Sequence, residues 1–290
     1  MERMISSDTT VFHDADLLLC GTAGQIKQYH DQIGEWIRRG GNPNIMRDGT
    51  SLMAHLWRGP DAEKDKFYDD ARGVRETARL ALIQDLLTHG ADAWLGSPSL
   101  FEIDTKQARI EPSLLLGIFS EHEKEGAKVR GPGGDNPLHA VVRHPELDLS
   151  SFVIGIDTSF LCPEWLNESN ALGNTPLMTL WGERSKTDMN NFQLVRAFGI
   201  TLDMAVAGCD LTQINHEGQC AASMIQSYEG IHTFLSDLPD NMEHTKDYRL
   251  ASQIAGDLDY LLEQIRVAAE RHTLAIATPK KSTGAKPHRF

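Results

Sequence analysis

Apolar residues recur along this chain at the three- and four-residue spacings of amphipathic helices. The segments GQIKQYHDQIGEWIRRGG (24–41) and ETARLALIQDLLTHG (76–90) each place large apolar residues on one helical face. Both run into glycine, which adopts the left-handed conformation that ends a helix at little cost. The pattern predicts helices that end at Gly41 and Gly90, and a third that ends at Gly208.

A second pattern marks helix starts. DGTSLMAHL (48–56), GDNPLHAVV (134–142) and LGNTPLMTLW (172–181) share glycine, a small polar residue and leucine in one order, and HEGQCAASMI (216–225) is a fainter copy. Asn136 suits the N-cap of its helix, and Pro137 suits the first helical position, where a missing N–H costs nothing. We expect a helix to begin at each copy.

These starts and ends alternate at intervals of roughly 40 residues, which predicts stacked helix pairs and an all-α fold. One pair cannot bury its apolar face alone, but stacked pairs share a continuous core. Residues 10–21 are expected to form a degenerate first helix. The charged stretch 59–73 is an insertion, and 94–133 fits the pattern poorly, with a helix start expected within 111–119.

The sequence resembles the ankyrin-repeat family, most closely in NTPLM (174–178) and THGADA (88–93). The resemblance covers residues 10–235 and implies a solenoid of about five degenerate helix-turn-helix repeats with short hairpin loops, diverged from the usual ~33-residue period. It also implies that His139 joins neighbouring loops by hydrogen bonds, in a network left incomplete where Met53 and Met178 take its place.

Two segments follow the predicted solenoid. An apolar stripe from Leu250 to Ala268 predicts a long helix over 243–275, which either caps the last repeat or mediates weak self-association. Residues 276–290 are basic and rich in small polar residues, so we expect a disordered tail. KKSTGAKPHR (280–289) resembles the amino-terminal tail of histone H3, which would make Lys281 and Lys286 modification sites; the alternative is an ordinary basic terminus.

Composition narrows the function. A net charge of −13 makes nucleic acid an unlikely partner, and no apolar run is long enough to predict a membrane span. The N-terminus lacks the pattern of a secretory signal, and the four cysteines form no CxxC, so we expect free thiols and a cytoplasmic protein.

Candidate chemistry is sparse. The chain has no GxxxxGK[ST], GxSxG or HExxH motif, so no catalytic residue, cofactor or metal is expected. HDAD (13–16) is interpreted as structural, HEGQC (216–220) as an exposed hairpin, and GPGGD (131–135) as a turn before a capped helix. An enzyme hidden in 94–133 or 240–275 remains an alternative.

The expected function is protein binding through the concave groove of the solenoid. Leu52, His55 and Leu56 are assigned inward positions, and the orientation of Trp181 is undecided. The residues assigned to the groove or to hairpin tips are Trp57, Arg58, Trp94, Arg143, His144, Thr179, Glu183, His216 and Glu217. Alternatively, Trp57 or Trp94 packs against the 59–73 insertion.

The diverged repeats and large insertions resemble those of bacterial ankyrin proteins. The resemblance implies an effector that is secreted into a host cell and acts on a host protein. The alternative is an inhibitor or immunity protein whose acidic groove neutralises a basic toxin.

Overall fold

The computed structural model describes residues 8, 10–59, 71–102, 112–126, 128–143, 162–184, 191–227, 260, 262–271, 273 and 274. This part of the chain is mostly helical, which confirms the predicted all-α class. It also contains one two-stranded antiparallel sheet. Residues 60–70 of the predicted 59–73 insertion, most of the predicted C-terminal helix and the whole basic tail lie outside the described residues.

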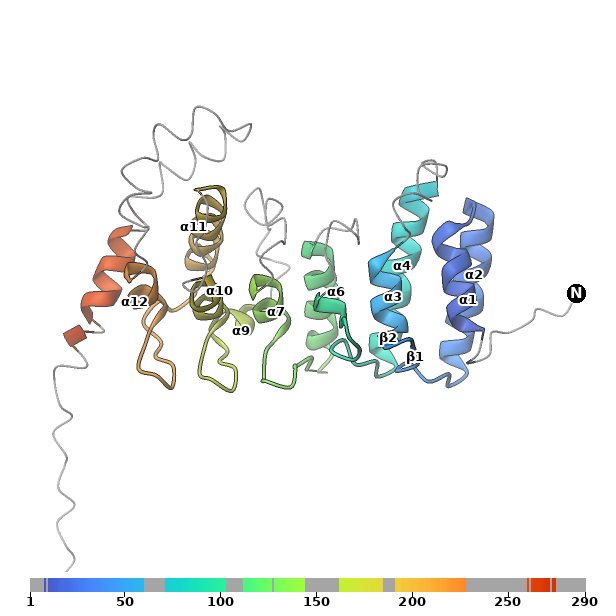
Figure 1. The fold of residues 1–290 in the computed structure, drawn as a ribbon, viewed down its shortest axis with the longest axis horizontal. Helices are drawn as coiled ribbons and strands as arrows, with labels where there is room; N and C mark the ends of the chain where they lie inside the picture. The colour runs from blue at the N-terminus through green and yellow to red at the C-terminus, as the bar shows by residue number, and fades with distance from the viewer. Residues whose placement is uncertain are drawn as a thin grey trace, which may run out of the picture.

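The helices stand side by side in a row that follows chain order (Figure 1). Neighbouring helices in the row pack on each other, as α1 does on α2 and α7 does on α10. The helices are α1 (Val11–Cys20), α2 (Ala23–Arg38), α3 (Leu52–Arg58), α4 (Arg72–Thr88), the 3-10 helix η3 (Leu100–Glu102), α6 (Pro112–Lys124), α7 (Pro137–Arg143), α9 (Pro163–Asn167), α10 (Pro176–Arg184), α11 (Asn191–Val206) and α12 (Ala221–Gln226). The strands β1 (Met46–Arg47) and β2 (Thr50–Ser51) form a hairpin before α3.

Two uncertain parts of the sequence pattern are now resolved. Helix α1 confirms the degenerate first helix expected within 10–21, and α6 confirms the helix start expected within 111–119. Residues 260 and 262–271 are helical, and Ile265 and Ala268 of the predicted apolar stripe are buried. The described part of the C-terminal helix therefore adds its apolar side to the core at the end of the row.

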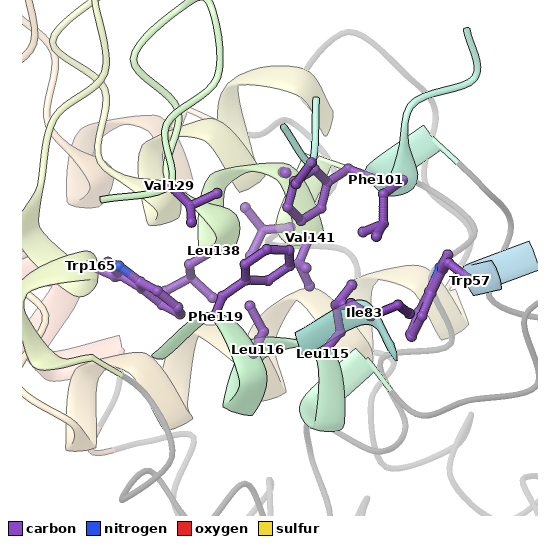
Figure 2. Packing of buried hydrophobic residues seen from close by; sticks show 14 of the residues in the cluster. Trp57, Ile83, Phe101, Leu115, Leu116, Phe119, Val129, Leu138, Val141 and Trp165 are labelled. Atoms are coloured by element: carbon purple, nitrogen blue, oxygen red, sulfur yellow. The ribbon is translucent and has the colours of Figure 1, made fainter. Parts of the chain in front are cut away.

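The buried side chains form one core that continues from helix to helix (Figure 2). In the centre of the row it passes from Trp57 and Ile83 through Phe119 to Leu138 and Trp165. No described helix pair encloses a core of its own, so each pair depends on its neighbours to cover its apolar residues.

The predicted helix starts are confirmed by their caps. At each of the four, the side chain before the helix accepts a hydrogen bond from the backbone N–H three residues on, which satisfies a donor that the first turn leaves open. The pairs are Ser51 with Ala54 at 3.2 Å, Asn136 with His139 at 3.0 Å, Thr175 with Met178 at 3.3 Å and Cys220 with Ser223 at 3.4 Å.

The predicted helix ends are confirmed at two of three glycines. Gly90 and Gly208 have φ of +87° and +99°, the left-handed conformation that favours glycine. The assignment of Gly41 is wrong: Gly40 is the left-handed residue, with φ of +87°. Gly41 is required for another reason, because a Cβ there would overlap the ring of Trp36.

Adjacent helix ends are joined by the same pair of hydrogen bonds at two places in the row. The amide of Asn44 donates to the carbonyl of Gly90 at 3.2 Å and accepts from the N–H of Asp92 at 2.7 Å. The amide of Asn167 donates to Gly208 at 3.0 Å and accepts from Asp210 at 2.6 Å. The two junctions therefore share the same hydrogen-bond pattern.

Candidate partner-binding face

The loops before α3, α7, α10 and α12 lie along one edge of the row (Figure 1), and we call this edge the hairpin face. Backbone hydrogen bonds join its loops in series. The N–H of Ala171 donates to Gly133 at 2.8 Å, and the N–H of His216 donates to Leu172 at 3.2 Å. Nearer the N-terminus, Ser97 donates to Gly49 at 2.9 Å. The loops before α7, α10 and α12 are thus joined to one another, and the first hairpin is joined to the loop that follows α4.

Each loop is closed by its own hydrogen bonds. The side chain of Asn170 accepts from the N–H of Leu172 and of Asn174, both at 3.0 Å. Asn215 repeats this closure in the next loop, where its side chain accepts from the N–H of Glu217 and of Gln219. Side chains that close turns in this way fix the loop without help from a partner.

His139 has the role that the resemblance implied. Its Nδ1 accepts from the N–H of Asn136 at 3.2 Å, and its Nε2 lies 2.8 Å from the carbonyl of Asn174 in the next loop. The ring is fully buried, and burial lowers its pKa. The bond to Asn174 therefore ties two hairpins together.

A hollow of about 580 Å³ opens on the hairpin face, between the loop that follows α4 and the loops before α7 and α10. We call it the central hollow. Its apolar side is formed by Trp94 and Phe101, and its polar side by Asp135, Arg143 and Asn170. The glycine-rich turn 131–133 and Leu172 also contribute to the lining. Its size is within the range of ligand-binding pockets.

Trp94 replaces a polar junction residue. It follows the helix-ending Gly90 by four positions, as Asn44 follows Gly40, but it stacks on Phe101 with ring centroids 4.4 Å apart. Phe101 in turn lies 5.3 Å from Phe119 in the core. A Cβ on Gly131 would come within 2.9 Å of the indole, so the glycine turn packs directly against the Trp94 ring.

Arg143 is exposed at the end of α7 and is oriented by Asp135. Arg143 Nη1 lies 2.6 Å from Asp135 Oδ2, and Asp135 Oδ1 accepts from Asn170 Nδ2 at 2.8 Å. The side chain of Asp135 is 8% exposed and that of Arg143 is 43% exposed. The carboxylate is thus used by the fold, while the guanidinium reaches the solvent.

A second polar cluster lies near the first hairpin. Asp16 accepts from Arg47 at 2.9 Å and pairs with His55 Nε2 at 2.8 Å. Burial would raise the pKa of Asp16, but the bonds from Arg47 and His55 outweigh it and lower the pKa. Burial lowers the pKa of His55, although Asp16 opposes that shift. The Asp16 carboxylate therefore connects α1 to the β-hairpin and to α3.

Two of the residues assigned to the groove are core residues. Trp57 and Thr179 are 2% and 3% exposed, so their assignment to the binding surface is wrong. Helix α3 packs against α1, α4 and η3, and α10 packs against α7, α9, α11 and α12. A helix with neighbours on several sides buries nearly its whole circumference. Trp181, left undecided by the sequence, is buried for the same reason.

The other candidates divide into three groups. Arg143, His216 and Glu217 are exposed on the hairpin face, as expected. Arg58 and Trp94 are half-buried. His144, Lys281, Lys286 and the side chain of Glu183 lie outside the described residues.

Sequence reasoning missed Phe101 and Leu172, and it assigned no binding role to the turn 131–135. The prediction of a turn is itself confirmed, since Gly131 N–H donates to the carbonyl of Asp135 at 2.8 Å. The signal that could have located the hollow was the poor fit of 94–133 to the repeat pattern, because a local departure from a repeat marks functional sites.

Within the described part of the chain, no three His, Cys, Asp or Glu side chains are placed to hold a metal ion. Among the same residues, no helix has the length and apolar character needed to cross a membrane. The comparisons add no relative: no profile of a known protein family matches the chain, and no curated protein matches it. The function is therefore argued from the hairpin face itself.

Proposed function

We propose that this chain is an ankyrin-type repeat protein that binds another protein through the hairpin face. The recurring caps at Ser51, Asn136 and Thr175 and the serial bonds between hairpins support the repeat architecture. The buried His139, which bridges two loops, supports it independently. A rigid row of loops suits recognition, because little conformational entropy is lost when a partner binds.

The central hollow is the observation that carries the binding proposal. It combines the half-buried Trp94, the exposed Arg143 and Leu172, which is 65% exposed. Tryptophan and arginine are the side chains most often found as binding anchors. An apolar recess with a charged rim is typical of a protein-binding surface.

We take the biological setting from the resemblance to bacterial ankyrin proteins. On that basis the chain is an effector that acts on a host protein. The inhibitor alternative requires an acidic groove. The described residues at the hairpin face include the cations Arg47 and Arg143, each paired with a carboxylate, Asp16 of α1 and Asp135 respectively. This distribution favours the effector over an inhibitor of a basic toxin.

The test is an affinity capture from host-cell and producing-cell lysates with two matched variants. The face variant carries Arg143→Ala, His216→Ala and Glu217→Ala. The control carries Glu121→Ala and Lys124→Ala, an exposed pair on α6. Circular dichroism verifies that both are folded.

We expect a partner that the wild type and the control retain and the face variant loses. A host protein would support the effector, and a basic toxin from the producing cell would support the inhibitor. A partner retained equally by all three would move binding away from the hairpin face. A metal-dependent activity of the purified chain would favour the alternative that the chain is an enzyme.

A further inference from the structure

The guanidinium of Arg143 is only partly used by the fold. One of its nitrogens, Nη1, pairs with Asp135. Neither Nε nor Nη2 has a partner among the described residues, and the side chain is 43% exposed at the rim of the central hollow. An arginine held by one carboxylate can still present two N–H groups to another, in the fork geometry that matches a carboxylate.

The positive and negative groups around the hollow differ in their exposure to solvent. Asp135 and Arg143 are the charged residues among those that line it. Asp135 is buried and both its oxygens are occupied, by Arg143 and by Asn170. A ligand in the hollow therefore meets an exposed cation and a shielded anion, and a negative group is favoured.

The remainder of the lining is suited to an apolar side chain. Trp94 is held in place by Phe101 on one side and by Gly131 on the other. Leu172 lies in the loop before α10 and is 65% exposed. The hollow has a volume of about 580 Å³, as ligand-binding pockets do. It can hold a few side chains but not a folded domain.

We propose that the central hollow binds an extended segment of the partner protein in which an aspartate or glutamate lies next to an apolar residue. The carboxylate pairs with the open N–H groups of Arg143, and the apolar side chain packs between Trp94 and Leu172. This inference rests on the proposed function and specifies the chemistry of its ligand. A basic segment would place like charge beside Arg143, and a single cation is too few to hold a nucleic-acid backbone.

The experiment selects ligands from a displayed library of random twelve-residue peptides on the immobilised full chain. We expect the selected peptides to share an acidic residue beside leucine, isoleucine, methionine or phenylalanine. Selected peptides are then synthesised with the acid replaced by its amide. We expect the amide peptide to bind at least about tenfold more weakly, since a charge-assisted hydrogen bond contributes roughly 1.5–3 kcal/mol.

Three variants locate the contact. Arg143→Met should weaken the acidic peptide at least about tenfold, and Arg143→Lys by less, because lysine keeps the charge without the fork. Leu172→Asp should weaken it comparably by repulsion. Leu172 is 65% exposed and takes no part in the pair between Arg143 and Asp135, so this variant tests the site even if Arg143→Met disturbs that pair. Glu121→Ala, on α6, should bind as the wild type does.

The outcomes separate this inference from the proposed function. Peptides without an acid, or equal binding of the amide form, would overturn the inference. If His216→Ala or Glu217→Ala abolishes peptide binding while the Arg143 and Leu172 variants do not, the hairpin face binds protein but the hollow is not the contact. If no peptide is selected and no partner is captured from lysates, both proposals fail.

Discussion

The Nε2 atom of His139 lies 2.8 Å from the backbone oxygen of Asn174, which is 35 residues further along the chain. The other ring nitrogen accepts from the N–H of Asn136. Only the neutral ring with its proton on Nε2 makes both bonds, because a protonated imidazole has two donors and no acceptor. One buried side chain thus couples a helix start to the next hairpin, provided that it stays uncharged.

We predict that the protein loses stability as the pH falls below about 6.5 and that His139 contributes to the loss. Burial lowers the pKa of His139 from 6.5, and Arg143 adds to this effect, while Asp135 and Glu168 oppose it. The unfolded chain therefore binds the proton first, so the contribution is complete above about 6.5 and declines as the pH falls toward the folded-state pKa. Urea unfolding at pH 8 and pH 5.5 measures it.

The comparison variant is His139→Gln, which cannot be protonated. Its free energy of unfolding should fall less between the two pH values than that of the wild type. His55 has a lowered pKa too, so His55→Gln is measured beside it. Equal pH dependence of the wild type and His139→Gln would contradict the prediction.

The sequence predicts those structural features that depend on residues close together along the chain. The caps at Ser51, Asn136 and Thr175 act on an N–H three positions away, so the motif contains the whole interaction. The helix-ending glycines are local in the same way. The glycine at 41 is likewise explained within its segment, because a Cβ there would overlap the ring of Trp36.

The candidate site depends on residues far apart, which explains the errors there. Trp57 follows the inward Leu56 and is assigned by the sequence to the opposite surface, but α3 packs against α1, α4 and η3, and Trp57 is buried. The central hollow brings together Trp94, the turn 131–133, Arg143 and Leu172, and no local pattern relates these positions. Only the stacking of the helix pairs places them on one surface.

We predict that Arg79→Met lowers the free energy of unfolding by about 2–4 kcal/mol, as expected when buried hydrogen bonds to a charged group are lost. Arg79 is 1% exposed, and its guanidinium donates to the carbonyl of Leu56 at 2.6 Å and also to the carbonyl of Trp57. Burial lowers the pKa of Arg79 to about 10, so it remains charged at neutral pH.

The control for this variant is Arg72→Met, since Arg72 pairs with Glu76 on the exposed surface of the same helix. An exposed ion pair contributes at most about 1 kcal/mol. Both variants are measured by urea unfolding at pH 7. If Arg79→Met is no more costly than Arg72→Met, the bonds to the end of α3 do not stabilise the fold.

We predict that iodide quenches one tryptophan of the five, and that this residue is Trp94. Trp36, Trp57, Trp165 and Trp181 are at most 4% exposed, whereas Trp94 is half-buried. Trp94→Phe should remove most of the quenchable fluorescence and cost about 1–2 kcal/mol, because a smaller ring still contacts Phe101. Unchanged quenching in Trp94→Phe would show that the aromatic side of the hollow is closed to solvent.

The bonds between hairpins predict a large difference between two glycine substitutions that share the same backbone strain. Gly173 and Gly90 have φ of +80° and +87°, so alanine costs roughly 1–2 kcal/mol at either position from the left-handed conformation alone. At Gly173 the added Cβ would also lie 2.8 Å from the backbone nitrogen of His216, the donor to Leu172. At Gly90 no described atom lies within 4 Å of the Cβ position.

Gly173→Ala should therefore destabilise the protein by about 1–3 kcal/mol more than Gly90→Ala, since the neighbouring hairpin must move or lose its hydrogen bond. Urea unfolding gives this difference directly, because the strain common to both substitutions cancels. Hydrogen exchange of the His216 amide supplies a second measurement, and it should be faster in Gly173→Ala alone. Equal costs and equal exchange would mean that the hairpins are not held in contact in solution. The rigid face on which partner binding is proposed would then be absent.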